Sequence, residues 1–151
     1  MPAHMLDLIE DGLEQAGRSL EGSTVALLGV AYLENADDTR NTPAADLAAL
    51  LLHRGAEVVA HDPHVRDADW QRALVDGHEV PLTKDLDVAL EGADCAAIVT
   101  RHRQYQDLTE EDLLPTMRTP VVVDGRNTLP RLKVGSPELL FRAIGKGDGA
   151  L

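Results

Sequence analysis

The sequence predicts an α/β fold, namely a doubly wound, mostly parallel sheet with helices on both faces, preceded by one N-terminal helix. Short apolar runs recur along the chain at 25–30, 58–61, 96–100 and 121–123. Such runs are typical of parallel strands that are buried on both faces. Segments with helical spacing or helix-capping residues separate these runs. Strands that alternate with helices in this way indicate a parallel sheet rather than a sandwich or a helix bundle.

The first half of the chain has the clearest signals for individual elements. Apolar residues recur at helical spacing near the N-terminus, which predicts an amphipathic helix over about 3–18. Thr42 and Pro43 are a favoured N-cap and a favoured first residue for a second helix. Gly55 is the residue expected just past the end of that helix, and the strand at 58–61 follows it.

Weaker signals predict the remaining elements: short helices over about 66–75 and 85–92, a helix opened by Thr109 and three acids, and short strands near 79–80 and over 138–144. No repeat, low-complexity stretch or internal linker divides the chain. We therefore expect one Rossmann-like domain over 23–151, with 1–22 as its leading helix.

Length and composition limit the classes of function. At 151 residues the chain is long enough for one domain with its own core. No apolar run approaches the roughly 20 residues of a membrane span. The acidic N-terminus is unlike a signal peptide, so we expect a cytoplasmic protein. The single cysteine, Cys95, excludes an internal disulfide and a cysteine-rich metal site, and we expect it to be a small core residue.

The charge of the chain argues against two classes of partner. Asp and Glu outnumber Lys and Arg by 26 to 14, for a net charge of −12. Such a surface repels nucleic acid and anionic lipid, so we expect neither as a partner. The acid-rich, lysine-poor composition fits the surface of a protein from a salt-rich cytoplasm, where ionic strength screens self-repulsion. A GC-rich genome that favours Ala, Asp and Arg codons explains the same composition.

The candidate site lies where the strands end. In open parallel sheets, ligands bind beyond the carboxyl ends of the strands, beside the point where strand order reverses. The loop after the first strand, 29–41, has about a dozen residues, whereas such loops commonly have ~2–6. It contains Gly29 alone and not G-x-G-x-x-G, which disfavours a plain NAD-binding domain. Thr100 and His102 end the fourth strand, where they either line the cleft or are ordinary loop residues.

This loop and three later motifs resemble a known family. Residues 28–43, LGVAYLENADDTRNTP, are similar to the G-x-[AS]-[YF]-K-x-x-x-x-D-T-R-x-S-P signature of the UDP-glucose/GDP-mannose dehydrogenase family, in its C-terminal UDP-binding domain. The motifs GAEVV with HDP at 55–63, VDGRN at 123–127 and IGKG at 144–147 follow in the family's order. Four motifs in order, at matching spacing, extend the resemblance over essentially the whole chain.

The resemblance implies a role in nucleotide-sugar oxidation. Family members oxidise the C6 hydroxyl of a UDP-sugar to a carboxylate in two NAD-dependent steps. The chain is thus expected to be the nucleotide-sugar-binding domain of a UDP-sugar 6-dehydrogenase, of the UDP-glucose or the UDP-N-acetylhexosamine type. In the full enzyme, NAD and the catalytic cysteine belong to an N-terminal domain, expected in cis or in trans.

Nothing in this sequence matches the family's cysteine segment. By the same resemblance, we expect this chain to hold no cofactor and to be inactive alone. The exposed leading helix and the absent partner domain lead us to expect a homo-oligomer. The alternative is a stand-alone, non-catalytic module for nucleotide binding or for oligomerisation.

Four residues are candidates for binding the UDP-sugar. Arg126 is the first, because a guanidinium pairs bidentately with phosphate oxygens and a strand end is a rigid mount; a surface or intersubunit ion pair is its alternative. Asn127 is expected to bond sugar or ribose hydroxyls or to allow a left-handed turn. Tyr32 is expected to lie near the nucleotide or to pack half-buried. Asp62 is placed to bind ribose hydroxyls or, alternatively, to cap its loop.

Other polar residues of the same edge are expected to have structural roles. Asp38 and Arg40 match the family's D-T-R pair, and we expect them to organise the long loop through an internal or intersubunit ion pair. Leu33 departs from the family, which usually has lysine there, so either another base pairs with the anionic substrate or the affinity differs. His61 and His64 are near neighbours, but strand alternation points adjacent side chains apart and no third ligand is evident, so we predict no metal site.

Overall fold

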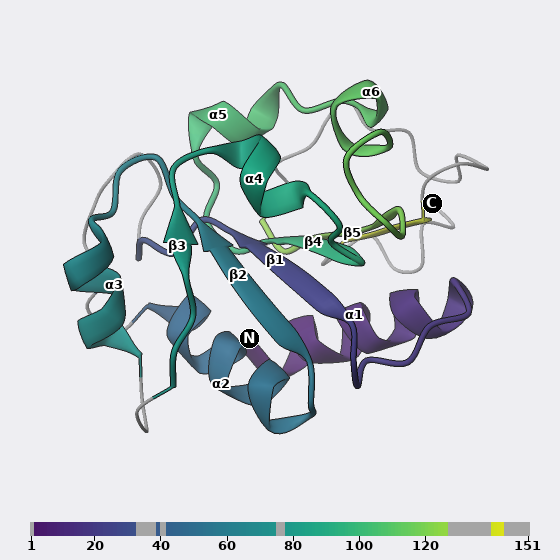
Figure 1. The fold of residues 1–151 in the computed structure, drawn as a ribbon, viewed down its shortest axis with the longest axis horizontal. Helices are drawn as coiled ribbons and strands as arrows, with labels where there is room; N and C mark the ends of the chain where they lie inside the picture. Colours follow the sequence, from purple (N-terminus) through teal and green to yellow (C-terminus); the bar gives the residue numbers. More distant parts are fainter. Residues whose placement is uncertain (1, 33–38, 40–41, 75–77, 127–139, 144–151) are drawn as a thin grey trace.

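The residues that the structure describes form a six-stranded parallel sheet with helices on both faces (Figure 1). This computed structural model describes residues 2–32, 39, 42–74, 78–126 and 140–143. The strands lie in the order β3-β2-β1-β4-β5-β6, and each neighbouring pair is parallel. The predicted doubly wound α/β fold is confirmed. Strand order reverses between β1 and β4, the position at which such sheets bind ligands.

Five of these strands lie close to their predicted positions, and β3 does not. The strands are β1 (Thr24–Leu28), β2 (Glu57–His61), β3 (Leu82–Thr83), β4 (Cys95–Ile98), β5 (Val121–Asp124) and β6 (Leu140–Ala143). The third was expected near 79–80, but the carbonyl of Val80 accepts hydrogen bonds from the side chains of Trp70 at 3.1 Å and Gln71 at 2.9 Å. Pairing with β2 therefore begins only at the Pro81 carbonyl, to which Ala60 N–H donates at 2.8 Å.

The described segments contain six helices, and a capping residue begins three of them. They are α1 (Pro2–Gln15), α2 (Pro43–His53), α3 (Asp67–Ala73), α4 (Leu86–Leu90), α5 (Arg103–Gln106) and α6 (Glu110–Leu113). Thr42 caps α2 by accepting from Ala44 N–H, and Thr109 and Asp112 form a capping box at α6. The one-turn α5 was not predicted, because His102 at its N-cap is not a favoured capping residue. No helix in this part of the chain is long and apolar enough to cross a membrane.

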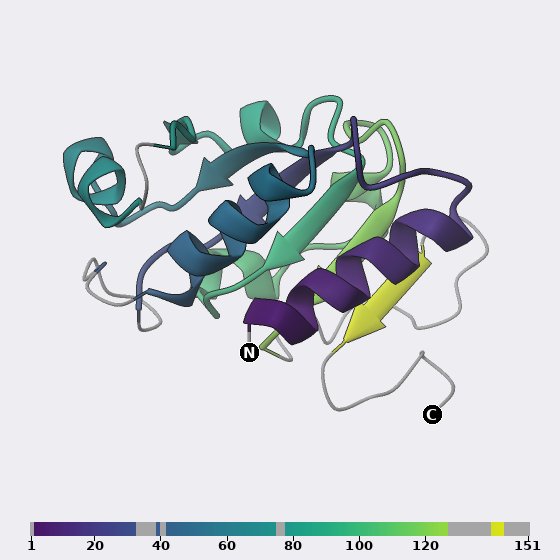
Figure 2. The same ribbon diagram turned by 90° about the horizontal axis from the view of Figure 1, so that it is seen from below.

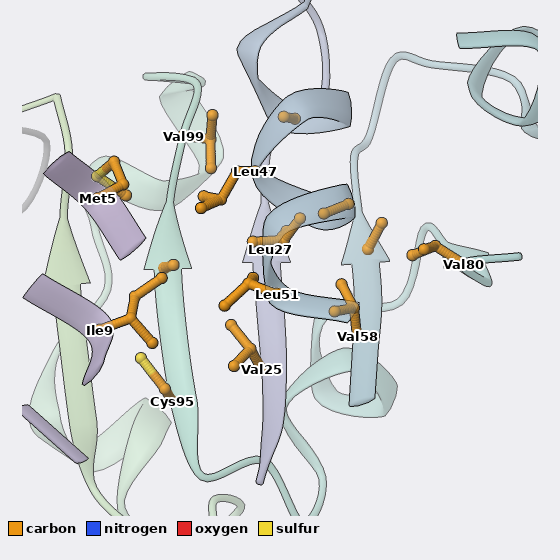
Figure 3. Close-up of a cluster of buried hydrophobic side chains, with 14 of the residues drawn as sticks. Met5, Ile9, Val25, Leu27, Leu47, Leu51, Val58, Val80, Cys95 and Val99 are labelled. Carbon is orange, nitrogen blue, oxygen red and sulfur yellow. The ribbon is translucent and has the colours of Figure 1, made fainter. Parts of the chain in front are cut away.

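Alternate side chains of the central strands fill two cores, one on each face of the sheet. Val25 and Leu27 of β1 join a core beneath α1 and α2, whereas Ala26 and Leu28 face the core beneath α4, α5 and α6. Figure 3 shows the first core, in which side chains of α1 and α2 meet those of β1, β2 and β4. The period of two in a strand thus accounts for the unbroken apolar runs of the sequence.

Helix α1 lies along the last two strands of the sheet (Figure 2). It approaches them closely at Gly12, where an added Cβ would lie 2.9 Å from Cγ1 of Val121 in β5. The buried Arg142 of β6 donates from Nε to Asp11 at 3.2 Å and also hydrogen-bonds the side chain of Gln15. The first helix of the chain is therefore fastened to its last strand.

A buried carboxylate joins the starts of β1, β4 and β5 at the amino edge of the sheet. Asp94, directly before β4, accepts hydrogen bonds from Thr24 N–H at 2.9 Å, from the hydroxyl of Thr119 at 2.7 Å and from Nε of Arg118 at 2.8 Å. Burial alone would raise the pKa of Asp94, but the bonds from Arg118, Thr24 and Thr119 outweigh it and lower the pKa to about 2. Asp94 is therefore ionised at neutral pH.

Candidate functional site

The carboxyl edge of the sheet is organised around a sharp turn at Gly29, directly after β1. Gly29 has φ +90°, and its N–H donates to the carbonyl of His61 at 2.8 Å. A Cβ added to Gly29 would lie 2.6 Å from Cβ of Thr100 and 2.8 Å from its carbonyl oxygen. Glycine is required here both by the backbone conformation and by the close approach of the loop after β4.

The carboxylate of Asp62 binds this turn to two other loops. Its side chain has no exposed surface. Within the described residues, five hydrogen-bonding groups lie 2.8–3.1 Å from it: the N–H groups of Val30, Ala31, His64 and Val65 and Nε2 of His102. Burial alone would raise the pKa of Asp62, but the bonds from His102, Val30 and His64 outweigh it and lower the pKa below its ordinary value. Asp62 therefore caps its loop, which was the structural alternative to ribose binding. Its contact with a nucleotide stays a prediction.

Thr100 and His102, the two polar residues after β4, belong to the same arrangement. The hydroxyl of Thr100 donates to the carbonyl of Ala31 at 2.6 Å. The buried ring of His102 contacts Asp62 on one side, and its plane meets the exposed ring of His64 in a T-shaped contact with centroids 4.8 Å apart. Both residues therefore hold the first loop in place.

Two further buried polar residues lie beneath this arrangement. The hydroxyl of Tyr105 donates to the carbonyl of His61 at 3.0 Å and lies 2.7 Å from Nδ1 of the same residue. Burial lowers the pKa of His61, and burial together with the charge of Asp62 raises the pKa of Tyr105. Both are neutral at neutral pH, as expected of structural groups. His61 is buried and His64 is exposed, and the segments described contain no group of three residues able to hold a metal ion.

A mainly apolar hollow opens at the same edge, on the side of the sheet that α1 and α2 cover. Its lining consists of Pro2, Met5, Pro43, Leu47, Val99, Gly125 and Arg126. Arg126 is exposed, and its N–H donates to Oδ1 of Asp124 at 3.0 Å, which fixes the turn that leaves β5. The guanidinium of Arg126 makes no ion pair with any residue placed in the structure. Among the described residues, therefore, no carboxylate competes with an anionic ligand for this side chain.

The other residues singled out in the sequence lie in three different settings. Tyr32 follows the Asp62-bound turn and is 48% exposed, so it is available to a ligand. Asn127, Asp38 and Arg40 lie outside the described residues, as does Leu33. Cys95 is fully buried in the core beneath α1, where burial raises the pKa of its thiol, so its prediction as a core residue is confirmed.

The sequence resembles the UDP-sugar dehydrogenases along most of its length. Residues 26–131 match the UDP binding domain of the UDP-glucose/GDP-mannose dehydrogenase family. UDP-N-acetyl-D-mannosamine dehydrogenase of Pyrococcus horikoshii is 33% identical over 148 residues, which are 98% of this chain and 31% of that protein. UDP-glucose 6-dehydrogenase of Rhizobium meliloti is 32% identical over 133 residues, which are 88% of this chain and 30% of that protein.

Solved structures of such enzymes contain the same fold. The structure of the Pyrococcus horikoshii UDP-D-ManNAc dehydrogenase superposes with a TM-score of 0.79 over 98% of this chain and 31% of its own. An NDP-N-acetyl-D-galactosaminuronic acid dehydrogenase from Methanosarcina mazei, 30% identical, also gives 0.79, over 96% of this chain and 29% of its own. The chain spans about 30% of the length of these relatives. It belongs to the UDP-glucose/GDP-mannose dehydrogenase family and corresponds to the UDP-binding domain of that family.

Proposed function

We propose that this chain is the nucleotide-sugar-binding domain of an NAD-dependent UDP-sugar 6-dehydrogenase, and that the diphosphate of its ligand binds at Arg126. The observation that carries the proposal is the exposed guanidinium of Arg126, which makes no ion pair with a described residue, beside an apolar hollow at the carboxyl edge of the sheet. A hollow with apolar walls and one well-placed polar group is typical of small-molecule sites. A guanidinium on a fixed turn suits the phosphate oxygens of such a ligand.

The charge distribution at this edge supports an anionic ligand. The chain carries a net charge of −12, yet Arg101 and Arg126 are both exposed directly after the neighbouring strands β4 and β5. Neither forms an ion pair with a residue placed in the structure. Two exposed cations at adjacent strand ends attract a diphosphate to this edge of an otherwise acidic molecule.

The oxidation itself belongs, in this proposal, to a larger enzyme. The relatives are named as UDP-N-acetyl-D-mannosamine and UDP-glucose dehydrogenases, and the chain covers only 31% and 30% of their lengths. We assign NAD and the catalytic thiol to a partner domain, in cis or in trans, and we expect the assembly to be a homo-oligomer. The ligand in this proposal is UDP-glucose or a UDP-N-acetylhexosamine.

The first test replaces Arg126. Arg126→Gln is expected to weaken UDP binding by about 10–100-fold, the value of a lost charge-assisted pair of hydrogen bonds. Isothermal titration calorimetry with UDP at up to millimolar concentration measures the change. Arg101→Gln is the matched control, since it removes the same charge from the next strand end and is expected to cost no more than about threefold through long-range attraction.

Two outcomes of this titration would contradict the proposal. Absence of UDP binding by the unmodified chain at millimolar ligand would remove the nucleotide-binding function of the chain itself. Equal losses in Arg126→Gln and Arg101→Gln would mean that diffuse charge, rather than a site at Arg126, attracts the ligand.

A second test concerns catalysis. The 151-residue chain mixed with NAD and either UDP-glucose or UDP-N-acetylmannosamine is expected to form no NADH. The first hydride transfer needs a site for NAD, and the loop after β1 lacks the G-x-G-x-x-G motif of such a site. The second needs an accessible thiol to capture the aldehyde, and Cys95 is fully buried. Absorbance of NADH follows the reaction, and turnover by the pure chain would refute this division of labour.

A further inference from the structure

We infer that His102, acting through the buried Asp62, positions the start of the loop after β1 and tunes ligand affinity by way of Val30 and Ala31, without touching the ligand itself. This inference rests on the proposed function, because it assumes that UDP binds beside the loop after β1. It assigns His102 and Thr100, neither of which is expected to contact UDP, a measurable effect on UDP affinity.

The backbone at the start of the loop is held at consecutive polar groups. Asp62 Oδ2 accepts from Val30 N–H at 2.8 Å and from Ala31 N–H at 3.1 Å. The Ala31 carbonyl accepts from the Thr100 hydroxyl at 2.6 Å. Because these groups bond to the side chains of Asp62 and Thr100, in the loops after β2 and β4, the segment up to Tyr32 is fixed relative to the sheet.

His102 fixes the carboxylate of Asp62, which in turn binds the backbone of Val30 and Ala31. Nε2 of His102 lies 2.8 Å from Oδ2 of Asp62, the same oxygen that accepts from both loop N–H groups. Neither side chain has any exposed surface. Without His102, the buried oxygen loses its only side-chain partner among the bonds described, which weakens its hold on Val30 and Ala31.

A fixed segment matters for binding because it presents Tyr32 in one place. Tyr32 is 48% exposed directly after Ala31, at the edge where Arg126 also lies. If the loop is ordered before the ligand arrives, binding does not have to pay the entropy of ordering it. Loosening the segment is therefore expected to weaken UDP binding even though every ligand-contacting side chain is retained.

The test uses three variants at His102 and Thr100 and one control at the amino edge of the sheet. His102→Leu removes the imidazole that bonds Asp62, and His102→Gln keeps an N–H donor that can reach the carboxylate. Thr100→Val removes the bond to the Ala31 carbonyl with little change of volume. Thr119→Val is the matched control, because it takes one side-chain donor from the buried Asp94 carboxylate at the opposite edge.

Two readouts separate positioning from general destabilisation. Calorimetry with UDP is expected to give an affinity about tenfold lower for His102→Leu and about threefold to tenfold lower for Thr100→Val. His102→Gln is expected to stay within about threefold of the unmodified chain, and Thr119→Val to lower Tm without changing the affinity. Amide hydrogen exchange of Val30 and Ala31, measured by NMR, is expected to accelerate at least about tenfold in His102→Leu and not in Thr119→Val.

Each outcome supports or overturns the inference. If Thr119→Val weakens UDP binding as much as Thr100→Val, or if exchange of Val30 and Ala31 is unchanged in the His102 and Thr100 variants, the positioning role is wrong. If the unmodified chain binds no UDP, the proposed function fails, and the exchange rates alone decide whether the pair holds the loop. If His102→Leu does not fold, Thr100→Val and His102→Gln carry the same comparison.

Discussion

Replacing Gly29 with alanine is expected to destabilise the fold by about 3–5 kcal/mol, which corresponds to a Tm lower by roughly 10–15 °C. Two costs add in this variant. A non-glycine residue at φ +90° is strained, and its Cβ would lie 2.6–2.9 Å from Thr100, two of those three contacts being with backbone atoms that cannot rotate away. The loops after β1 and β4 would have to separate at the strand-order reversal.

Urea unfolding followed by the fluorescence of Trp70, the single and fully buried tryptophan, measures the loss. Gly22→Ala is the matched control, because Gly22 has a similar φ of +83° but an added Cβ would meet no atom within 4 Å. This control is expected to lose only about 1 kcal/mol from backbone strain. Equal losses in the two variants would show that the contact with Thr100 does not matter.

Replacing Asp94 with asparagine is expected to lower the free energy of unfolding by about 2–3 kcal/mol at neutral pH. The carboxylate is buried and accepts bonds from the N–H of Thr24, the hydroxyl of Thr119 and the guanidinium of Arg118. An amide cannot accept from all three and has no charge for Arg118. The loss is therefore expected at the amino edge of the sheet, far from the ligand hollow, and UDP affinity should not change.

The difference in unfolding free energy between the wild type and Asp94→Asn is expected to depend on pH. The pKa of Asp94 falls from an ordinary 3.8 to about 2 on folding. Stabilisation by this group is therefore complete above the unfolded value and is lost as pH falls from about 4 towards 2. Urea unfolding is expected to show the gap between wild type and Asp94→Asn shrinking over that interval.

The exposed Asp7, to which the described structure assigns no partner, supplies the control variant Asp7→Asn for the pH series. Its gap from wild type is expected to stay near zero at every pH. A gap for Asp94→Asn that remains constant down to pH 2 would contradict the assignment of the low pKa to this carboxylate.

Local signals account for the parts of the fold that the sequence predicts well. Thr42, Asp85 and Thr109 each cap the helix that follows them, and a capping residue acts within three positions of itself. The central strands were predictable because strands buried on both faces need unbroken apolar runs. The single turn α5 and the displaced β3 depend instead on contacts between distant segments, such as the bonds of Trp70 and Gln71 to Val80.

The candidate site was predictable only in part. The position of Arg126 follows from the end of β5, which the sequence shows directly. The hydrogen bonds that hold the first loop could not be predicted in this way. Asp62 is 32 positions from Val30 and 40 positions from His102, and no local pattern connects them. The ligand roles of Arg126, Asn127, Tyr32 and Asp62, and the loop role of Asp38 and Arg40, stay predictions.

The attachment of α1 to β5 and β6 has a consequence for synthesis on the ribosome. Asp11 and its partner Arg142 are separated by 131 positions. At roughly 5–20 residues per second, a ribosome needs on the order of ten seconds to make the strands against which α1 packs. During that interval the helix can pack against α2, but the part of its apolar stripe that covers β5 and β6 stays uncovered, so the nascent chain is exposed to chaperones and to mispairing until those strands emerge.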